Sequence, residues 1–272
     1  MTASTLTAPR TLSRRVSPAA TLRHTATLAW RSLVQIKHNP MELIDLSIQP
    51  IMFVLLFTYV FGGQMAGGHP VQYLQFALPG IIAQNAMFAT MNTGFLLNTD
   101  ITKGVFDRLR SPPIGRMAPL AGRIVADTVK QAWSMAILLA VGMLIGFRVK
   151  TNVGGLLLAF LLLLAFALAF SWIAVLIGVL VSEPDKVMIF GFTTVFPLSF
   201  TSSAFARPDT MPGWLQAWVK VNPVTHLADA TRGLINGGAV ASPVIKTMVW
   251  GVAIAVVFAP LAVRAFRKRA SD

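Results

Sequence analysis

The sequence contains no cysteine and little charge. Without cysteine, the chain can form no disulfide, no thiolate metal site and no thiol nucleophile. Charged residues make up 12% of it and hydrophobic residues 55%, with a mean hydropathy of +0.66, whereas soluble domains carry about twice that charge. We therefore expect an integral membrane protein.

Motifs of the main catalytic and metal-binding classes are also missing. No GxxxxGKS or GxxxxGKT phosphate loop occurs, so any energy from ATP has to come from a separate partner. Neither a GxSxG elbow nor an HExxH motif occurs. The histidines are scattered over several loops and are expected at interfacial or exposed positions: His24, His38, His69 and His226. We expect a chain that is not an enzyme and binds no metal or cofactor itself.

The net charge of +13 would also suit a nucleic-acid binder. The basic residues, however, flank the apolar runs and do not follow one continuous patch. We interpret them as anchors toward anionic lipid and expect no nucleic-acid partner.

The amino end precedes the first apolar run. Residues 1–20 have too little apolar content to fold alone, so we expect a disordered basic tail. No short apolar region with a small-residue cleavage site occurs there, and we expect no removed leader. In residues 22–37, apolar side chains recur at helical spacing with basic ones elsewhere. This pattern predicts an amphipathic helix lying in the membrane interface.

Six apolar runs come close to the roughly 20 residues that a membrane-crossing helix needs. They cover residues 43–63, 77–98, 124–147, 153–181, 187–205 and 243–263. The third run includes Asp127 and Lys130, which we place in the headgroup zone, where long side chains can snorkel. The sequence predicts an all-α, six-span transmembrane domain over residues 21–272.

Lysine and arginine fall unevenly on the two sides of these runs. Seventeen of the 23 lie on the side that holds both termini, and six lie on the other. Because cytoplasmic loops are enriched in these residues, we expect both termini in the cytoplasm.

A charged segment, DITKGVFDRLRSPPIGR at residues 100–116, separates the second and third runs. If residues 100–110 form a helix, Ile101, Val105 and Leu109 share one face. A two-faced helix at a membrane surface favours a mechanical contact with another protein. Phe106 either inserts into that partner or packs on this chain's own helices. The candidate contact residues are Ile101, Lys103, Val105, Phe106, Asp107, Leu109 and Arg110.

Two of the predicted spans are rich in amides and hydroxyls. The side chains that could line a translocation path are Asn85 and Asn92 in the second run and Thr193, Thr194 and Ser199 in the fifth. Asn85 and Asn92 share a helical face, which would suit either a path for amphiphilic cargo or a hydrogen bond to a neighbouring helix. Both interpretations remain open.

The segment before the sixth run is too broken to span a membrane and too apolar for a free loop. It contains Trp214, Trp218 and the pair Asn222-Pro223. We predict one or two short interfacial helices on the outer face, with the tryptophans at headgroup depth.

An ion- or proton-driven carrier is the alternative to an ATP-driven one. Such carriers usually hold ionisable residues in mid-span, whereas here the carboxylates lie at the edges of the runs: Glu42, Asp45, Asp100, Glu183 and Asp185. This placement weakens the alternative. A membrane enzyme or scaffold ranks lowest, because no nucleophile, metal set or catalytic carboxylate pair is found.

Four stretches together resemble a known family. They are IQPIMFVLLFTYVFGG at 48–63, LPG followed by MNTG in the second run, the charged segment continued to residue 131, and NPVTHLADATRGL at 222–234. In order and spacing the chain resembles permeases of type 2 ABC exporters, particularly the daunorubicin-resistance branch of actinobacteria. Other members read nearer to RGTLERLR in the charged segment, so this chain fits the drug-resistance branch better.

The resemblance implies an exporter of a hydrophobic drug or lipid in a bacterial plasma membrane. It implies two copies of a separate ATPase, which binds ATP and magnesium, and a second permease copy, as a homodimer or a heterodimer. The 100–110 helix would contact the ATPase, and Trp214, Trp218, Asn222 and Pro223 would shape an outer gate.

Overall fold

The structure is a computed structural model that describes residues 23, 27, 34, 40–65, 67–104 and 118–269. Among these residues the regular secondary structure is helical throughout, with no strand. This confirms the predicted all-α class. The predicted tail at 1–20 lies outside the described residues. So does the predicted interfacial helix at 22–37, apart from three helical positions.

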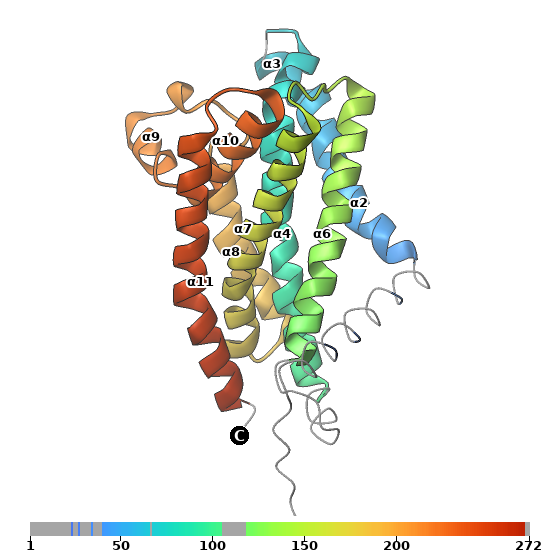
Figure 1. Cartoon of the computed structure of the whole chain (residues 1–272), viewed down its shortest axis with the longest axis vertical. Helices are drawn as coiled ribbons and strands as arrows, with labels where there is room; N and C mark the ends of the chain where they lie inside the picture. Colours follow the sequence, from blue (N-terminus) through green and yellow to red (C-terminus); the bar gives the residue numbers. More distant parts are fainter. Residues whose placement is uncertain are drawn as a thin grey trace, which may run out of the picture.

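The helices form an elongated bundle (Figure 1). In chain order they are α2 (Pro40–Leu55), η1 (Leu56–Phe61), α3 (Gly62–Met65), α4 (Pro70–Thr102), α6 (Ala118–Ile145), α7 (Val153–Leu180), α8 (Pro184–Phe200), η2 (Pro208–Thr210), α9 (Gly213–Val219), α10 (Pro223–Asn236) and α11 (Ala241–Arg269). The long helices run along the bundle axis, while α9 and α10 cap its upper end (Figure 1). The C-terminus lies at the lower end. The central helix α4 packs against α2, α6, α7, α8 and α10.

Four described helical stretches are long and apolar enough to cross a membrane. They are Ser47–Gln64, Ile124–Ile145, Val153–Leu180 and Ala241–Arg269, and they coincide with the first, third, fourth and sixth predicted runs. The second and fifth runs are also helical. However, α4 carries many polar side chains among its 33 residues, and α8 has only 17 residues.

The bounds of these two helices differ from the prediction. Helix α4 starts at Pro70, seven positions before the predicted run, because a proline at the first turn loses no helical hydrogen bond. Helix α8 ends at Phe200 and not at 205. There the Asn222 side-chain amide donates to the carbonyls of Leu198 (2.8 Å) and Thr201 (3.0 Å). These bonds give partners to carbonyl groups that a helix end leaves without one.

Small residues let α4 and α7 approach closely. A Cβ atom on Gly94 would lie well inside van der Waals distance of the Ala174 carbonyl oxygen, and one on Gly178 would collide with the Gly94 carbonyl. Such contacts are typical of helix packing in membranes, where lipid is as apolar as the protein. The contact holds α4 and α7 together in the lower half of the bundle (Figure 1).

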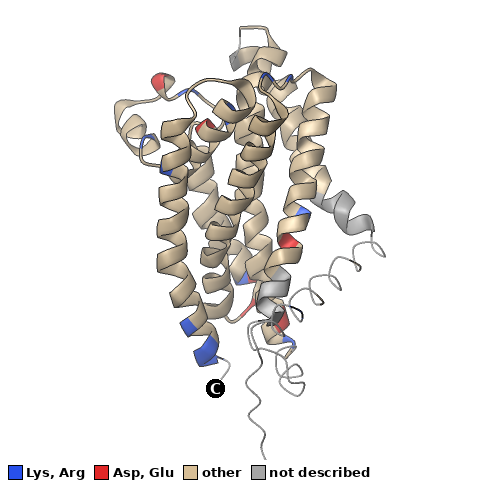
Figure 2. Ribbon diagram, viewed as in Figure 1, with Lys and Arg blue, Asp and Glu red and all other residues tan. Residues whose placement is uncertain are grey.

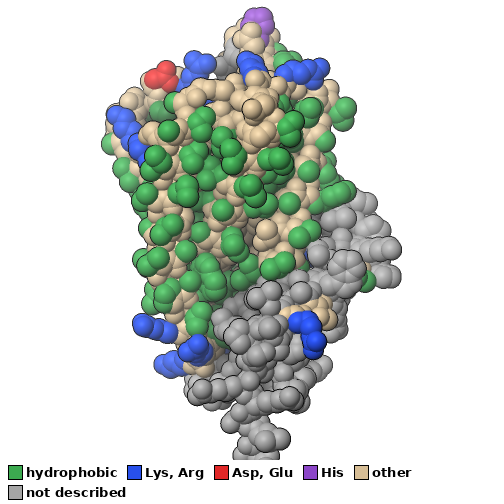
Figure 3. Space-filling view, viewed as in Figure 1, with side chains coloured by type: hydrophobic (Ala, Val, Ile, Leu, Met, Phe, Trp, Pro, Cys, Tyr) green, Lys and Arg blue, Asp and Glu red, His purple; other side chains and the backbone are tan. Residues whose placement is uncertain are grey.

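Most described basic residues lie near the two ends of the bundle, and one more lies part-way along α6, the helix that contains Lys130 (Figure 2). Arg264, Arg267 and Lys268 lie at the lower end of α11, and hydrophobic side chains cover most of the visible face between the ends (Figure 3). Exposed large apolar side chains along α11 include Ile245, Met248, Val249, Val252 and Val256. A broad apolar belt of this kind is the surface that contacts lipid tails.

Candidate functional site

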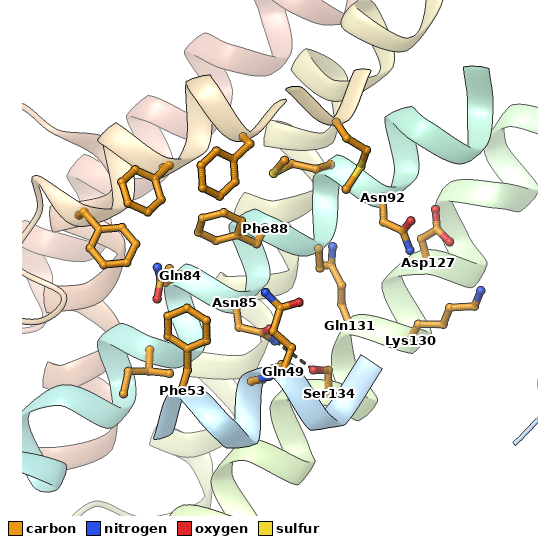
Figure 4. Close-up of a pocket in the computed structure, with 18 residues that line it drawn as sticks. Gln49, Phe53, Gln84, Asn85, Phe88, Asn92, Asp127, Lys130, Gln131 and Ser134 are labelled. Carbon is orange, nitrogen blue, oxygen red and sulfur yellow. Dashed lines mark hydrogen bonds between the residues drawn. The ribbon is translucent and has the colours of Figure 1, made fainter. Parts of the chain in front are cut away.

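A cavity of about 580 Å³ lies among α2, α4, α6 and α8 (Figure 4). Cavities of this size hold drug-sized molecules. Its lining comes from four helices that meet around the polar face of α4. One part of its wall is aromatic and another is polar.

The aromatic wall comes mainly from α8. Phe192, Phe196 and Phe200 recur every four residues, so one helix face presents all three rings. Ring centroids of successive members lie 4.9 Å and 4.3 Å apart. Phe88 of α4 continues the row at 6.1 Å from Phe192, and Phe53 of α2 lies across the cavity (Figure 4). Stacked rings of this kind offer a flat apolar surface to a ligand.

The polar wall comes from α6 and α4. On α6, Asp127, Lys130, Gln131 and Ser134 line the cavity at helical spacing. The Asn85 side-chain amide of α4 donates to the Ser134 hydroxyl at 3.0 Å (Figure 4). The cavity therefore places charged and amide groups beside aromatic rings, an arrangement that fits an amphiphilic molecule.

The predicted path residues do not share one environment. Asn85 and Asn92 both line the cavity, and Asn85 also makes the interhelical hydrogen bond that the packing interpretation predicts. Thr193 is exposed and Thr194 is half-buried; neither lines the cavity, and they donate to the carbonyls of Ile189 and Phe190 four residues back. Ser199 is fully buried outside the lining.

Sequence reasoning missed most of the cavity wall. Asp127 and Lys130, which we predicted in the headgroup zone, lie in the first two turns of the candidate span of α6 and also line the cavity. The spacing of the α8 phenylalanines was the available signal for the aromatic wall.

The predicted outer-gate residues lie at the upper end of the bundle. Trp214 is 75% exposed on α9, whereas Trp218 donates its indole N–H to the Thr201 hydroxyl at 2.7 Å. Asn222 is buried at the start of α10, where its side-chain oxygen accepts from the Val224 amide and Pro223 occupies the first turn. The α9 and α10 helices thus close over the end of α8.

The predicted ATPase contact lies largely outside the described residues. Ile101 is half-buried in the last turn of α4, and Lys103 follows as an exposed cap residue at the lower end. The other predicted contact residues, Val105, Phe106, Asp107, Leu109 and Arg110, are not described. Only the start of the segment is therefore placed.

A second polar cluster, which sequence reasoning did not single out, lies near the upper end of α4. Its centre is Arg232 of α10, whose side chain is 17% exposed and forms a 2.6 Å ion pair with Asp229. Burial lowers the pKa of Arg232, while the adjacent Asp229 carboxylate opposes this shift. Nearby, the Tyr73 hydroxyl donates to the Phe205 carbonyl at 3.0 Å.

No group of three or more metal-binding side chains occurs within the part of the chain that the structure describes. The cavity offers a single carboxylate and several amides, which is a set suited to hydrogen bonding rather than to holding a metal ion.

Comparisons with known proteins agree with this architecture. Residues 23–236 match the family described as ABC-2 type transporter. The chain is 40% identical, over 94% of its length and 89% of the relative, to the daunorubicin resistance ABC transporter permease protein DrrB1 of Streptomyces coeruleorubidus. It is 26% identical to the probable doxorubicin resistance ABC transporter permease protein DrrC of Mycobacterium tuberculosis, over 86% of this chain and 84% of that one. It is 27% identical to the putative transport permease ycf38 of Cyanophora paradoxa, over 77% and 73% of the two chains. The chain belongs to the ABC-2 type transporter family.

Proposed function

We propose that this chain is the membrane-spanning permease subunit of an ABC exporter and that the cavity among α2, α4, α6 and α8 holds its cargo. The cavity carries the proposal, because it joins an aromatic wall to amide and charged groups inside a membrane protein. The cargo class that fits it is a hydrophobic or amphiphilic compound, such as a drug or a lipid. Of these two cargo classes, the drug is supported by relatives named as daunorubicin and doxorubicin resistance permeases.

We infer six membrane spans with both termini in the cytoplasm of a bacterial cell. Helices α4 and α8 join the four candidate spans to make six, since both run along the bundle axis (Figure 1). Asn85 and Asn92 of α4 line the cavity, and the Thr193 and Thr194 hydroxyls of α8 donate to carbonyls of their own helix, which lowers the cost of polar groups in a span. The excess of basic residues on the side of the termini supports this orientation.

The energy source in this proposal is a separate ATPase subunit, present in two copies, that binds ATP and magnesium. The sequence holds no phosphate loop, and the charged segment after α4 supplies a contact for such a subunit. A second permease copy, identical or similar, completes the membrane part. Closure of the ATPases on ATP would displace the lower ends of the spans and change access to the cavity.

Reconstitution of this chain with its ATPase partner tests the proposal. Vesicles that contain both subunits should move a fluorescent hydrophobic compound when ATP is supplied, and an ionophore that collapses the proton gradient should leave this transport unchanged. An ion- or proton-driven carrier would show the reverse: transport would stop with the ionophore and continue without ATP. That result would overturn the proposal.

The partner contact has its own test. Leu109→Asp places a charge on the apolar face of the predicted 100–110 helix and should reduce both copurification with the ATPase and export. Asp107→Asn alters the charged side instead and serves as the comparison. If Leu109→Asp changes neither measurement, the segment is not the coupling contact.

A further inference from the structure

Pro79 opens a gap in the hydrogen bonding of α4. Because proline has no backbone N–H, the Gln75 carbonyl four residues earlier loses its helical partner. Asn236, in the last turn of α10, fills the gap: its side-chain amide donates to the Gln75 carbonyl at 2.6 Å. The Gln75 side chain donates back to the Asn236 side-chain oxygen at 2.8 Å. Two residues far apart in sequence thus repair the break reciprocally.

Arg232, one turn before Asn236, joins three elements through one guanidinium group. Its Nε donates to the Phe76 carbonyl of α4 at 3.0 Å, and its Nη2 donates to the Ser203 carbonyl at 3.0 Å. Its Nη1 pairs with Asp229, whose carboxylate also accepts from the Ser203 hydroxyl at 2.8 Å. The guanidinium carbon lies 4.0 Å from the centre of the Phe76 ring.

Close backbone packing accompanies these polar contacts. A Cβ atom on Gly80 would overlap the Ala204 carbonyl, so only glycine lets α4 approach the segment after α8 this closely. The LPG sequence at 78–80 and the α10 sequence therefore build one joint. We name this joint the outer clamp; its residues are Gln75, Phe76, Ser203, Asp229, Arg232 and Asn236.

We propose that the outer clamp is a rigid strut that fixes α4 to α10 and to the segment after α8, so that movement of the lower end of α4 reaches the outer surface. This inference rests on the proposed function. Helix α4 has 33 residues and is about 50 Å long at the usual helical rise. Its lower end leads directly into the charged segment, and its upper end is held by the outer clamp.

The contacts favour a strut over a contact that opens in each cycle. Arg232 is largely buried, and its Nε, Nη1 and Nη2 each donate to a protein acceptor. Opening would leave unpaired a buried charge and the Gln75 carbonyl that Pro79 frees, and would remove the Arg232 donor from the Ser203 carbonyl. A joint that stays closed avoids this repeated penalty.

The first experiment removes the guanidinium in the reconstituted complex. Arg232→Gln should lower the amount of compound exported per ATP hydrolysed by about tenfold, while copurification with the ATPase and ATP hydrolysis persist. Arg232→Lys keeps the charge but not the three-way geometry and should give an intermediate loss. The matched control is Lys246→Gln near the start of α11, at the same end of the bundle, where the side chain is exposed. Export per ATP that stays at the wild-type level in Arg232→Gln would overturn the strut.

The second experiment separates a strut from a gate and does not depend on the stability of Arg232→Gln. Because the chain has no cysteine, Gln75→Cys with Asn236→Cys introduces the only two thiols. The double variant should export poorly until a short bifunctional thiol reagent joins α4 to α10, and joining should restore export. If the cross-link stops export instead, the outer clamp opens during transport and the proposal is wrong. Wild-type vesicles that need no ATP would overturn the proposed function itself, which is a separate outcome.

Discussion

The cavity and the outer clamp are both polar regions around α4, but they use their polar groups differently. In the outer clamp, Arg232 donates to α4, to the segment after α8 and to Asp229 of its own helix, and the Gln75 carbonyl accepts from Asn236 of α10. In the cavity, amide and charged side chains from α4 and α6 line a wall beside aromatic rings, and the Asn85 amide donates to the Ser134 hydroxyl across it. A fully bonded polar group specifies one packing, whereas a polar group on a cavity wall can exchange water for a ligand. The comparison assigns rigidity to the outer clamp and recognition to the cavity.

The largest effect is expected at the backbone contact within the outer clamp region. Gly80→Val would force β-carbon and methyl groups into the Ala204 carbonyl, and backbone cannot move aside as a side chain can. We expect a loss of about 3 kcal/mol or more in folding stability, measured as thermal unfolding in detergent. The control is Gly213→Val, because a Cβ at Gly213 meets no atom within 4 Å. Equal stability of the two variants would show that α4 and the segment after α8 are not tightly packed.

A smaller loss is expected when Arg232 loses its carboxylate. Asp229→Ala leaves a largely buried guanidinium with two carbonyl acceptors but no counter-charge. The expected destabilisation is about 2 kcal/mol, since the Asp229 side chain is 37% exposed and water compensates in part. Chemical unfolding of the purified complex measures it. A variant as stable as the wild type would mean that the outer clamp does not depend on the ion pair.

The cavity variant should change selectivity and leave stability nearly intact. Phe196→Ala removes the middle ring of the α8 row and should raise the half-maximal export concentration of planar aromatic compounds roughly three- to tenfold. Compounds without rings should change less. Phe190→Ala on the same helix is the matched control, because Phe190 is exposed and does not line the cavity. Equal shifts in the two variants would exclude the aromatic wall as the binding surface.

The smallest effect is expected at the exposed ion pair between Glu183 and Lys186. Their 2.8 Å contact is nearly as short as the 2.6 Å contact between Arg232 and Asp229, but the Glu183 and Lys186 side chains are 62% and 51% exposed. Glu183→Ala should therefore change unfolding stability by at most about 0.5 kcal/mol. Comparing Glu183→Ala with Asp229→Ala separates how burial and how contact distance affect the stability that an ion pair contributes. A loss as large as that of Asp229→Ala would contradict the importance of burial.

Hydropathy and proline positions predicted much of the bundle. The uncharged run at 153–181 is α7 almost to the residue, because such a run has no stable alternative to a helix in lipid. The predicted fifth run ended five residues beyond α8, because the Asn222 side chain from a distant segment binds the carbonyls at the end of the helix.

The two functional regions were harder to predict, for physical reasons. Gln75 and Asn236 are separated by 161 positions, and their pairing depends on how α10 folds back on α4. Nothing local marks Gln75 as the partner of an asparagine in another helix. Asn85 and Asn92 were accessible to prediction because their spacing gives one helical face. The place of Asp127 in the cavity wall was not, because it depends on how α6 packs beside α2 and α4.

The most direct test of the contrast between the two regions is to measure cargo affinity and the ratio of export to ATP hydrolysis in the same vesicles. We predict that Phe196→Ala weakens cargo binding and leaves the ratio unchanged, whereas Arg232→Gln leaves binding unchanged and lowers the ratio. If either variant alters both quantities to the same extent, recognition and transmission are not separated between the cavity and the outer clamp.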